Sequence, residues 1–161
     1  MKWIGKNGTH STLDEGYDFI IIDKWKKKYH FKISTFECPS GFVSEAIEVI
    51  DKKKDNEPRI INVLNDFDSD TEKSELLLKA KIKREINQRH LKSENGNLQI
   101  SDDWQLRGNI SWNDNMTDTE FNTKFVIDGK RITVEQFLKM IEPFSGFNFK
   151  FKILDPSDEI E

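Results

Sequence analysis

The sequence predicts an α+β fold: a mainly antiparallel sheet packed by one long and one short helix. Short segments with period-2 alternation recur along the chain, two segments carry helix-capping patterns, and the early strands follow one another with the spacing of a meander. A length of 161 residues suits one domain. We expect a flexible N-terminal arm over residues 1–16, a single domain over 17–155 and an acidic tail over 156–161.

The first part of the domain is predicted to form four strands, at residues 17–23, 29–37, 42–50 and 59–64. The second of these alternates clearly, with Tyr29, Phe31 and Ile33 on one face, which is typical of a half-buried strand. Residues 42–50 fit a helix or a strand, and we favour a strand because of the meander spacing. The charged residues 51–57 are expected to form a solvated loop.

A long helix is predicted from about Thr71 to Leu91. Ser69 is its expected N-cap, with Glu72 completing a capping box. Leu78, Ile82 and Ile86 are spaced four residues apart and form its apolar stripe. The sequence ENGN at 94–97 is expected to end it.

The last third is predicted to contain strands at about 98–100, 106–112, 121–127 and 130–132. Asp128-Gly129 indicates a tight type I′ turn between the last two. A second helix should start at Thr133, with Gln136 in a capping box and an apolar stripe of Phe137, Leu138 and Ile141. Residues 147–154 (FNFKFKIL) alternate strictly, which predicts a closing strand with Phe149 in the core.

Several of these segments carry a resemblance. They are FECPSGFVSEAIEVI and NVLNDFDSD in the middle of the chain, and FVIDGKRITVEQFLKMI and GFNFKFKILD in the last third. Over about residues 28–155 the chain resembles a family of uncharacterised bacterial proteins catalogued only as domains of unknown function. The resemblance implies a common fold unit and a bacterial source, and it implies no activity.

The amino-acid composition excludes several classes of protein. The chain has 25 Lys and Arg against 29 Asp and Glu, a net charge of −4, which disfavours coating nucleic acid by bulk charge. The single cysteine, Cys38, excludes an intramolecular disulfide and a cysteine-based zinc cluster. The longest apolar run near the start is too short for a signal peptide or a membrane span. We therefore expect a cytoplasmic protein with no membrane partner.

Catalytic and metal-binding patterns are weak. Asp66, Asp68 and Asp70 have the spacing that opens a calcium loop, but Thr71 stands where the loop needs glycine and Leu77 where it needs glutamate. Helix capping is the favoured interpretation of these carboxylates. The three histidines lack zinc-binding spacing, and no glycine-rich phosphate loop is present. We assign no catalytic residue, metal or cofactor, and the sequence leans away from an enzyme.

Two groups of residues are candidates for binding. Residues 73–92 contain seven basic and two acidic side chains, and the candidate basic face consists of Lys79, Lys81, Lys83, Arg84 and Arg89. Such a face could contact phosphates, contact an acidic protein, or simply be solvated. Trp25 and Trp104 are candidates for exposed aromatic contacts, because Trp is enriched at binding hot spots.

The leading hypothesis is a small cytosolic bacterial protein-interaction module with a protein partner, and toxin neutralisation or phage defence is the setting that its composition suggests. The alternative is nucleic-acid binding through the basic helix 73–92. The sequence leaves the oligomeric state open.

Overall fold

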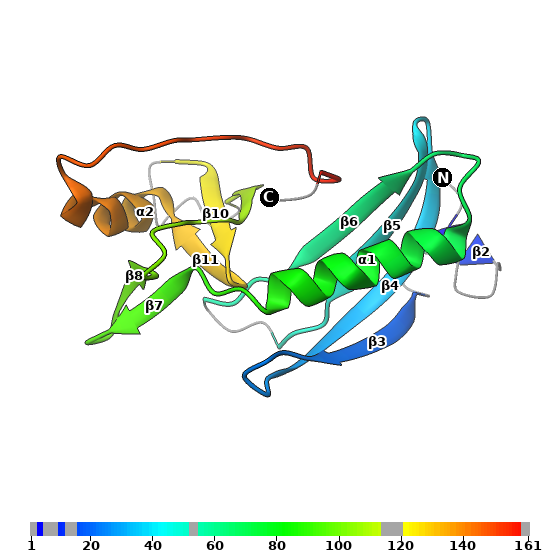
Figure 1. Cartoon of the computed structure of the whole chain (residues 1–161), viewed down its shortest axis with the longest axis horizontal. Helices are drawn as coiled ribbons and strands as arrows, with labels where there is room; N and C mark the ends of the chain where they lie inside the picture. The colour runs from blue at the N-terminus through cyan, green and yellow to red at the C-terminus, as the bar shows by residue number, and fades with distance from the viewer. Residues whose placement is uncertain (1–2, 5–9, 12–15, 52–54, 114–120, 159–161) are drawn as a thin grey trace. The chain divides into compact units, whose positions relative to one another are not determined.

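The computed structural model describes residues 3–4, 10–11, 16–51, 55–113 and 121–158 (Figure 1). It confirms the α+β class. The described strands form a six-stranded, a three-stranded and a two-stranded sheet, and two α-helices accompany them. None of the helices in the described residues is long and apolar enough to cross a membrane.

The chain separates into two compact units. Unit 1 consists of Met1–Ile50, Pro58–Asn87 and Leu154–Glu161, and unit 2 consists of Asp51–Glu57 and Gln88–Ile153. This differs from the single domain expected over residues 17–155. The chain passes from one unit to the other four times, and no Pro- or Ser-rich linker marks these points. Composition therefore gave no signal of a boundary.

The sheet of unit 1 is antiparallel throughout. Its main strands are β3 (Tyr17–Ile22), β4 (Lys28–Cys38), β5 (Gly41–Glu48) and β6 (Ile60–Asn65). The choice of a strand over residues 42–50 is confirmed by β5. Within the expected arm, β1 (Trp3–Ile4) pairs with both β4 and β2 (His10–Ser11), so these four residues belong to the sheet. Most other residues of the arm lie outside the described part.

One helix, α1 (Thr71–Ile86), lies along a face of this sheet (Figure 1). The predicted stripe is confirmed, because Leu78, Ile82 and Ile86 are buried in one core with Phe31 and Ile33 of β4. Each fully buried side chain of this kind stabilises the fold by about 1.5–3 kcal/mol. The burial extends one turn further toward the N-terminus than predicted, where Ser74 and Glu75 are also buried.

Both ends of α1 differ from the prediction. Asp70, not Ser69, is the N-cap, and its side chain accepts a 3.0 Å hydrogen bond from the Glu72 backbone N–H. The helix ends at Ile86 rather than at Leu91. Beyond it, β7 (Leu91–Glu94) and β8 (Asn97–Ile100) form a hairpin around Asn95-Gly96. Both turn residues have positive φ, as a type I′ turn requires, so ENGN turns a hairpin instead of ending a helix.

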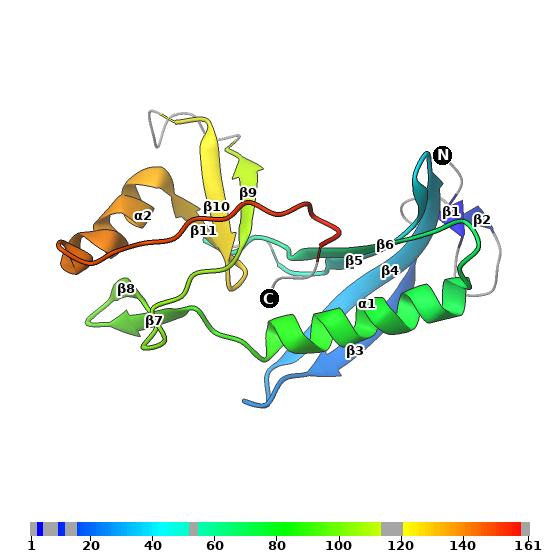
Figure 2. The same ribbon diagram turned by 45° about the horizontal axis from the view of Figure 1, so that its top comes forward.

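Unit 2 contains a second antiparallel sheet, with β9 (Asn109–Trp112), β10 (Thr123–Ile127) and β11 (Lys130–Thr133) (Figure 2). The turn at Asp128-Gly129 is confirmed, with φ of 53° and 72°. The capping box of Thr133 and Gln136 at the start of α2 (Val134–Ile141) is confirmed as well.

The apolar stripe predicted for α2, Phe137, Leu138 and Ile141, is only partly right. Met140 is buried with Ile127 and Ile132, and the Phe137 ring stacks on Phe125 at 4.7 Å between centroids. Leu138 and Ile141 are exposed instead. The helix therefore faces the sheet with residues 137 and 140, one turn apart.

The loop at 51–57 is partly built into unit 2. Glu57 N–H donates to Gly129 O and Arg131 N–H donates to Asp55 O, both at 2.9 Å. The Lys124 amine also forms a 2.8 Å ion pair with the Glu57 carboxylate. Residues 55–57 therefore run along β11 rather than standing free in solvent; residues 52–54 lie outside the described part.

The predicted closing strand at 147–154 is wrong. The segment belongs to no strand (Figure 2). Phe149 is 92% exposed. Phe147, Phe151 and Ile153 are exposed as well. Alternation reports strand propensity but not whether a partner strand is present, so the pattern predicted a buried face that no described strand covers.

Candidate functional site

Lys81, placed by sequence on the basic face, is only 4% exposed. Its amine donates to three backbone carbonyls: Asn62 O at 3.0 Å, Asp158 O at 2.8 Å and Pro156 O at 3.4 Å. Lys81 thus ties residues 156–158 of the expected acidic tail to the outer side of β6. It cannot contact a phosphate in this arrangement.

The other basic candidates do not form one continuous face. The Lys79 amine lies 5.3 and 5.2 Å from the ring centroids of Tyr17 and Phe19, which is cation–π geometry. Lys83 and Arg84 are exposed on the last turn of α1. Arg89 is exposed too, but it lies beyond the helix in unit 2. Only Lys83 and Arg84 remain as exposed neighbours among the five, and their binding role stays a prediction.

The aspartates at the start of α1 act locally. Asp70 is the N-cap, and Asp66 accepts the Ser69 backbone N–H through its own carbonyl at 3.0 Å. Within the described part of the chain, no three His, Cys, Asp or Glu side chains gather in an arrangement that could hold a metal ion.

A cluster of ionisable groups at the opposite end of α1 escaped the sequence analysis. Arg59 Nε lies 3.7 Å from Glu48 Oε2, and its guanidinium lies 5.3 Å from the Tyr29 ring centroid. The Tyr29 hydroxyl donates to Asp23 Oδ2 at 3.2 Å. Burial raises the pKa of Glu48 and of Glu85, although Arg59 opposes both shifts. The alternation of β5 and β6 places Glu48 and Arg59 on the core side of the sheet. The period-2 pattern of these strands could therefore have predicted that the two charged side chains lie near each other.

In unit 2, one carboxylate joins two hairpins. Asp128, in the turn between β10 and β11, accepts the backbone N–H groups of His90 and Leu91, both at 2.8 Å. The His90 carbonyl in turn accepts the Ser101 N–H at 2.9 Å. The turn that begins at Ser101 is therefore connected to the β10–β11 turn through His90 and the Asp128 carboxylate.

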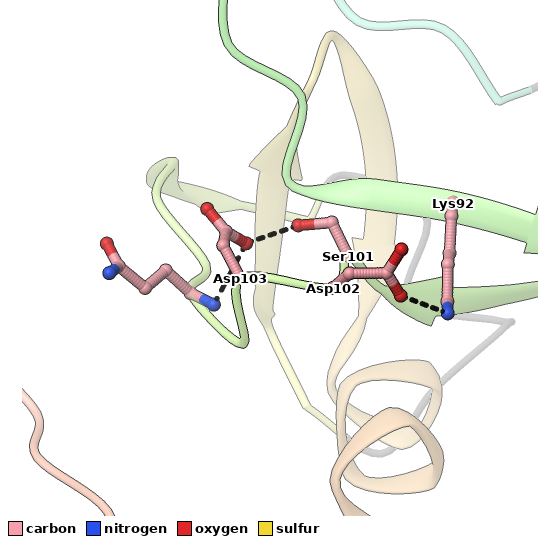
Figure 3. Close-up of polar contacts among 5 residues, drawn as sticks. Lys92, Ser101, Asp102 and Asp103 are labelled. Carbon is pink, nitrogen blue, oxygen red and sulfur yellow. Dashed lines mark hydrogen bonds and ion pairs between the residues drawn. The ribbon is translucent and has the colours of Figure 1, made fainter.

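Short polar contacts fix this turn, residues 101–104 (Figure 3). Asp103 accepts from the Ser101 hydroxyl and from the Gln105 backbone N–H, and the Ser101 bond is the main cause that lowers the pKa of Asp103. The Lys92 amine of β7 pairs with Asp102 at 2.7 Å, which raises the pKa of Lys92. Trp104 N–H donates to Ser101 O at 3.0 Å and closes the turn.

The turn presents Trp104 in the left-handed region, with φ of 56°. Its indole packs edge-to-face against Phe144 and Phe147, with centroids 6.0 and 5.5 Å apart, and the two phenyl rings are 5.7 Å apart. We call Trp104, Phe144 and Phe147 the aromatic cluster. Trp104 is 65% exposed and Phe147 is also exposed, so the cluster offers its rings to solvent.

Trp25, the other aromatic candidate, lies in the turn between β3 and β4. It is 40% exposed, and the Lys24 amine lies 4.5 Å from its ring centroid. The indole of Trp104, by comparison, contacts two phenyl rings. Both tryptophans are exposed, and a binding role for either remains a prediction.

Comparison with known families divides the chain after residue 87, which is one of the four passages between the units. Residues 14–87 match the model described as Domain of unknown function (DUF7686), and residues 90–158 match Domain of unknown function (DUF7713). The chain carries two domains of unknown function. The DUF7686 match falls in unit 1 apart from residues 51–57. The DUF7713 match falls in unit 2 apart from residues 154–158, and it contains the whole aromatic cluster. A search of curated proteins and a search of solved structures each found no match.

Proposed function

We propose that this chain is a protein-interaction module that contacts its partner through the aromatic cluster of the DUF7713 domain. The supporting observation is the exposed Trp104, packed against Phe144 and Phe147 on a turn that side-chain hydrogen bonds hold in place. Tryptophan and phenylalanine are enriched where protein interfaces bury their core.

The rigidity of the turn adds to this argument. A side chain that is already ordered loses less conformational entropy on binding than a mobile one. Asp103 and Ser101 fix the turn, and Phe144 and Phe147 restrict the indole itself. The left-handed backbone of Trp104 is a cost for a bulky residue, and such strain is commonly retained where it positions a functional group.

Nucleic-acid binding through α1 is the weaker alternative. It requires phosphate contacts from a basic surface, and the structure leaves Lys83 and Arg84 exposed side by side while Lys81 binds carbonyls inside unit 1. For the setting, we retain the proposal of a bacterial cytoplasm, with toxin neutralisation or phage defence as the process. Only composition and the single cysteine support it.

Affinity capture with the full chain tests the main proposal. The wild type, Trp104→Ala and Trp25→Ala would be immobilised at equal density, exposed to source lysate with and without nuclease, and the retained proteins quantified. We expect a partner at near-stoichiometric yield with the wild type and with Trp25→Ala. We expect at least a tenfold loss with Trp104→Ala, as at a hot-spot residue.

Two results would contradict the proposal. Equal retention by Trp104→Ala would show that the aromatic cluster is not the contact surface. Loss of the partner on nuclease treatment would show that nucleic acid bridges it, and a steep salt dependence of that capture would favour the alternative.

A further inference from the structure

β9 is an open edge of the sheet in unit 2. The strand order is β11-β10-β9, and in the described part of the chain no strand lies beyond β9. Ile110 and Trp112 are 49% and 62% exposed on the same sheet face as the buried Ile132. The opposite edge differs, because Asn56 bridges to Lys130 of β11. An apolar open edge is a surface on which another strand can pair.

The same unit carries a segment with the properties of a free strand. Residues 148–153, here called the extended segment, expose Phe149, Phe151 and Ile153 on alternate positions, with Lys150 and Lys152 between them. Covering these rings requires a partner that also bonds the backbone, since an unpaired buried N–H or C=O is costly. A sheet edge supplies both an apolar face and backbone partners.

We infer that the extended segment of one copy of this chain pairs as an antiparallel strand with the outer edge of β9 in a second copy. Each copy then donates one strand and accepts one, so the exchange closes as a two-fold dimer. The inference goes beyond the proposed function, because it requires no other protein and uses no residue of the aromatic cluster.

The side-chain patterns define a register. With Lys150 opposite Ser111, Phe151 lies opposite Ile110 and Phe149 opposite Trp112. Aromatic–aromatic and aromatic–β-branched pairs across strands are favourable. Ile110 already pairs with Phe125, and Phe125 with Ile132, so Phe151 would continue this apolar row across the sheet.

Charge favours this pairing over its competitors. Lys152 would lie opposite Asn109, so both lysines meet neutral polar residues. An antiparallel pairing of two extended segments around Lys150 would place the two copies of Lys150 face to face, which is destabilising. A shift by one residue would put a lysine against Ile110. A lipid surface would bury the rings but leave the strand backbone unpaired.

Sedimentation velocity of the full chain over a concentration series tests the inference. Two short strand additions bury less surface than a permanent interface, so we expect a reversible monomer–dimer equilibrium. The donor variant is Phe149→Lys with Phe151→Lys, and the acceptor variant is Ile110→Lys. We expect each to weaken the dimer at least tenfold. Ile22→Lys, an equally exposed strand position in unit 1, is the matched control and should dimerise normally.

Mixing the two variants gives the sharpest readout. The donor variant retains an intact β9 and the acceptor variant retains an intact extended segment, so an equimolar mixture keeps one of the two strand additions. We expect the mixture to associate more strongly than either variant alone. Folding is checked by near-UV circular dichroism, and the donor positions lie outside both cores.

Three outcomes would overturn the inference: a wild-type monomer at every concentration, a dimer that all variants form equally, or a monomer whose amides at 149–153 are protected from hydrogen exchange. The last would place the strand on its own chain. None of these outcomes bears on capture of a partner by Trp104, so the proposed function stands or falls separately.

Discussion

Lys81 shows how a charged side chain can serve the fold rather than a ligand. Its amine donates hydrogen bonds to the backbone carbonyls of Asn62 in β6 and of Pro156 and Asp158 near the end of the chain. We expect Lys81→Met to lower the free energy of unfolding by about 2–3 kcal/mol, because hydrogen bonds from a charged donor are lost and buried carbonyls are left unpaired. Lys83→Met, an exposed neighbour on the same helix, should stay within about 0.5 kcal/mol. Equal urea midpoints for the two variants would refute this role.

Glu85 makes stability depend on pH. Burial raises its pKa, and the nearby Lys81, Arg59 and Arg84 only partly offset the effect. A carboxyl whose pKa is higher in the folded than in the unfolded state contributes stability below the unfolded pKa, and this contribution is lost as pH rises through the folded pKa. Glu85→Gln cannot ionise, so we expect it to unfold at higher urea than the wild type at pH 7. The gap should shrink toward about pH 4. A wild type that is more stable than Glu85→Gln at pH 7 would contradict this.

Phe149 and Phe31 are a matched pair with opposite environments. Phe31 is fully buried beneath α1, whereas Phe149 is almost fully exposed. We expect Phe31→Ala to cost about 3–5 kcal/mol and Phe149→Ala to change monomer stability by less than about 0.5 kcal/mol. Denaturation at low protein concentration measures both. A loss of several kcal/mol for Phe149→Ala would place this ring in a core.

The sequence held part of this information at the residue scale. Positions 78, 81, 82, 85 and 86 form a broad helical stripe, so the burial of Lys81 and the half-burial of Glu85 could have been suspected from spacing alone. The hydrogen-bond partners of Lys81 could not have been predicted in the same way. Asn62, Pro156 and Asp158 are far from Lys81 along the chain, and no local pattern brings carbonyls to an amine.

At the scale of elements, Asp128 links the β10–β11 hairpin to the start of β7. Its carboxylate accepts two backbone N–H groups, and its φ of 53° suits Asp or Asn. We expect Asp128→Ala to cost about 2–3 kcal/mol, because two partly buried donors lose their partner and the turn becomes strained. Asp128→Asn keeps an acceptor oxygen and should cost about 1 kcal/mol or less. Faster hydrogen exchange at the His90 and Leu91 amides in Asp128→Ala alone would confirm the link, and unchanged exchange there would refute it.

Elements defined by neighbouring residues were predictable, and elements defined by distant partners were not. The Asp128-Gly129 turn and the Thr133–Gln136 capping box are encoded within four residues, and both are confirmed. Asn95-Gly96 carried an equally local signal, but it was interpreted as the end of the preceding helix and not as a hairpin turn. The extended segment has strand periodicity and no described strand beside it, because pairing depends on the rest of the fold. The aromatic cluster also joins residues about 40 positions apart, so only the exposure of Trp104 was foreseeable.

At the scale of the whole molecule, each unit has a hydrophobic core of its own. Ile82 lies in the core of unit 1 and Ile132 in that of unit 2. The two family matches meet after residue 87, at one of the passages between the units. Cores that share no residues can open separately. We expect Ile82→Ala to lower protection from hydrogen exchange in β4 and β5 while β10 and β11 remain protected, and Ile132→Ala to do the reverse. Each substitution should cost its own unit about 2–5 kcal/mol.

The four chain passages between the units make this a demanding prediction. Residues 51–57 belong to unit 2, although strands of unit 1 precede and follow them in the sequence. Residues 154–158 belong to unit 1, where the Lys81 amine binds the Asp158 carbonyl. If these passages couple the cores, either substitution lowers protection in all the strands together, and a single unfolding transition results. If the cores are independent, the substituted unit alone loses protection. In that case Lys81→Met should destabilise unit 1 only, because the carbonyls that it binds all belong to that unit.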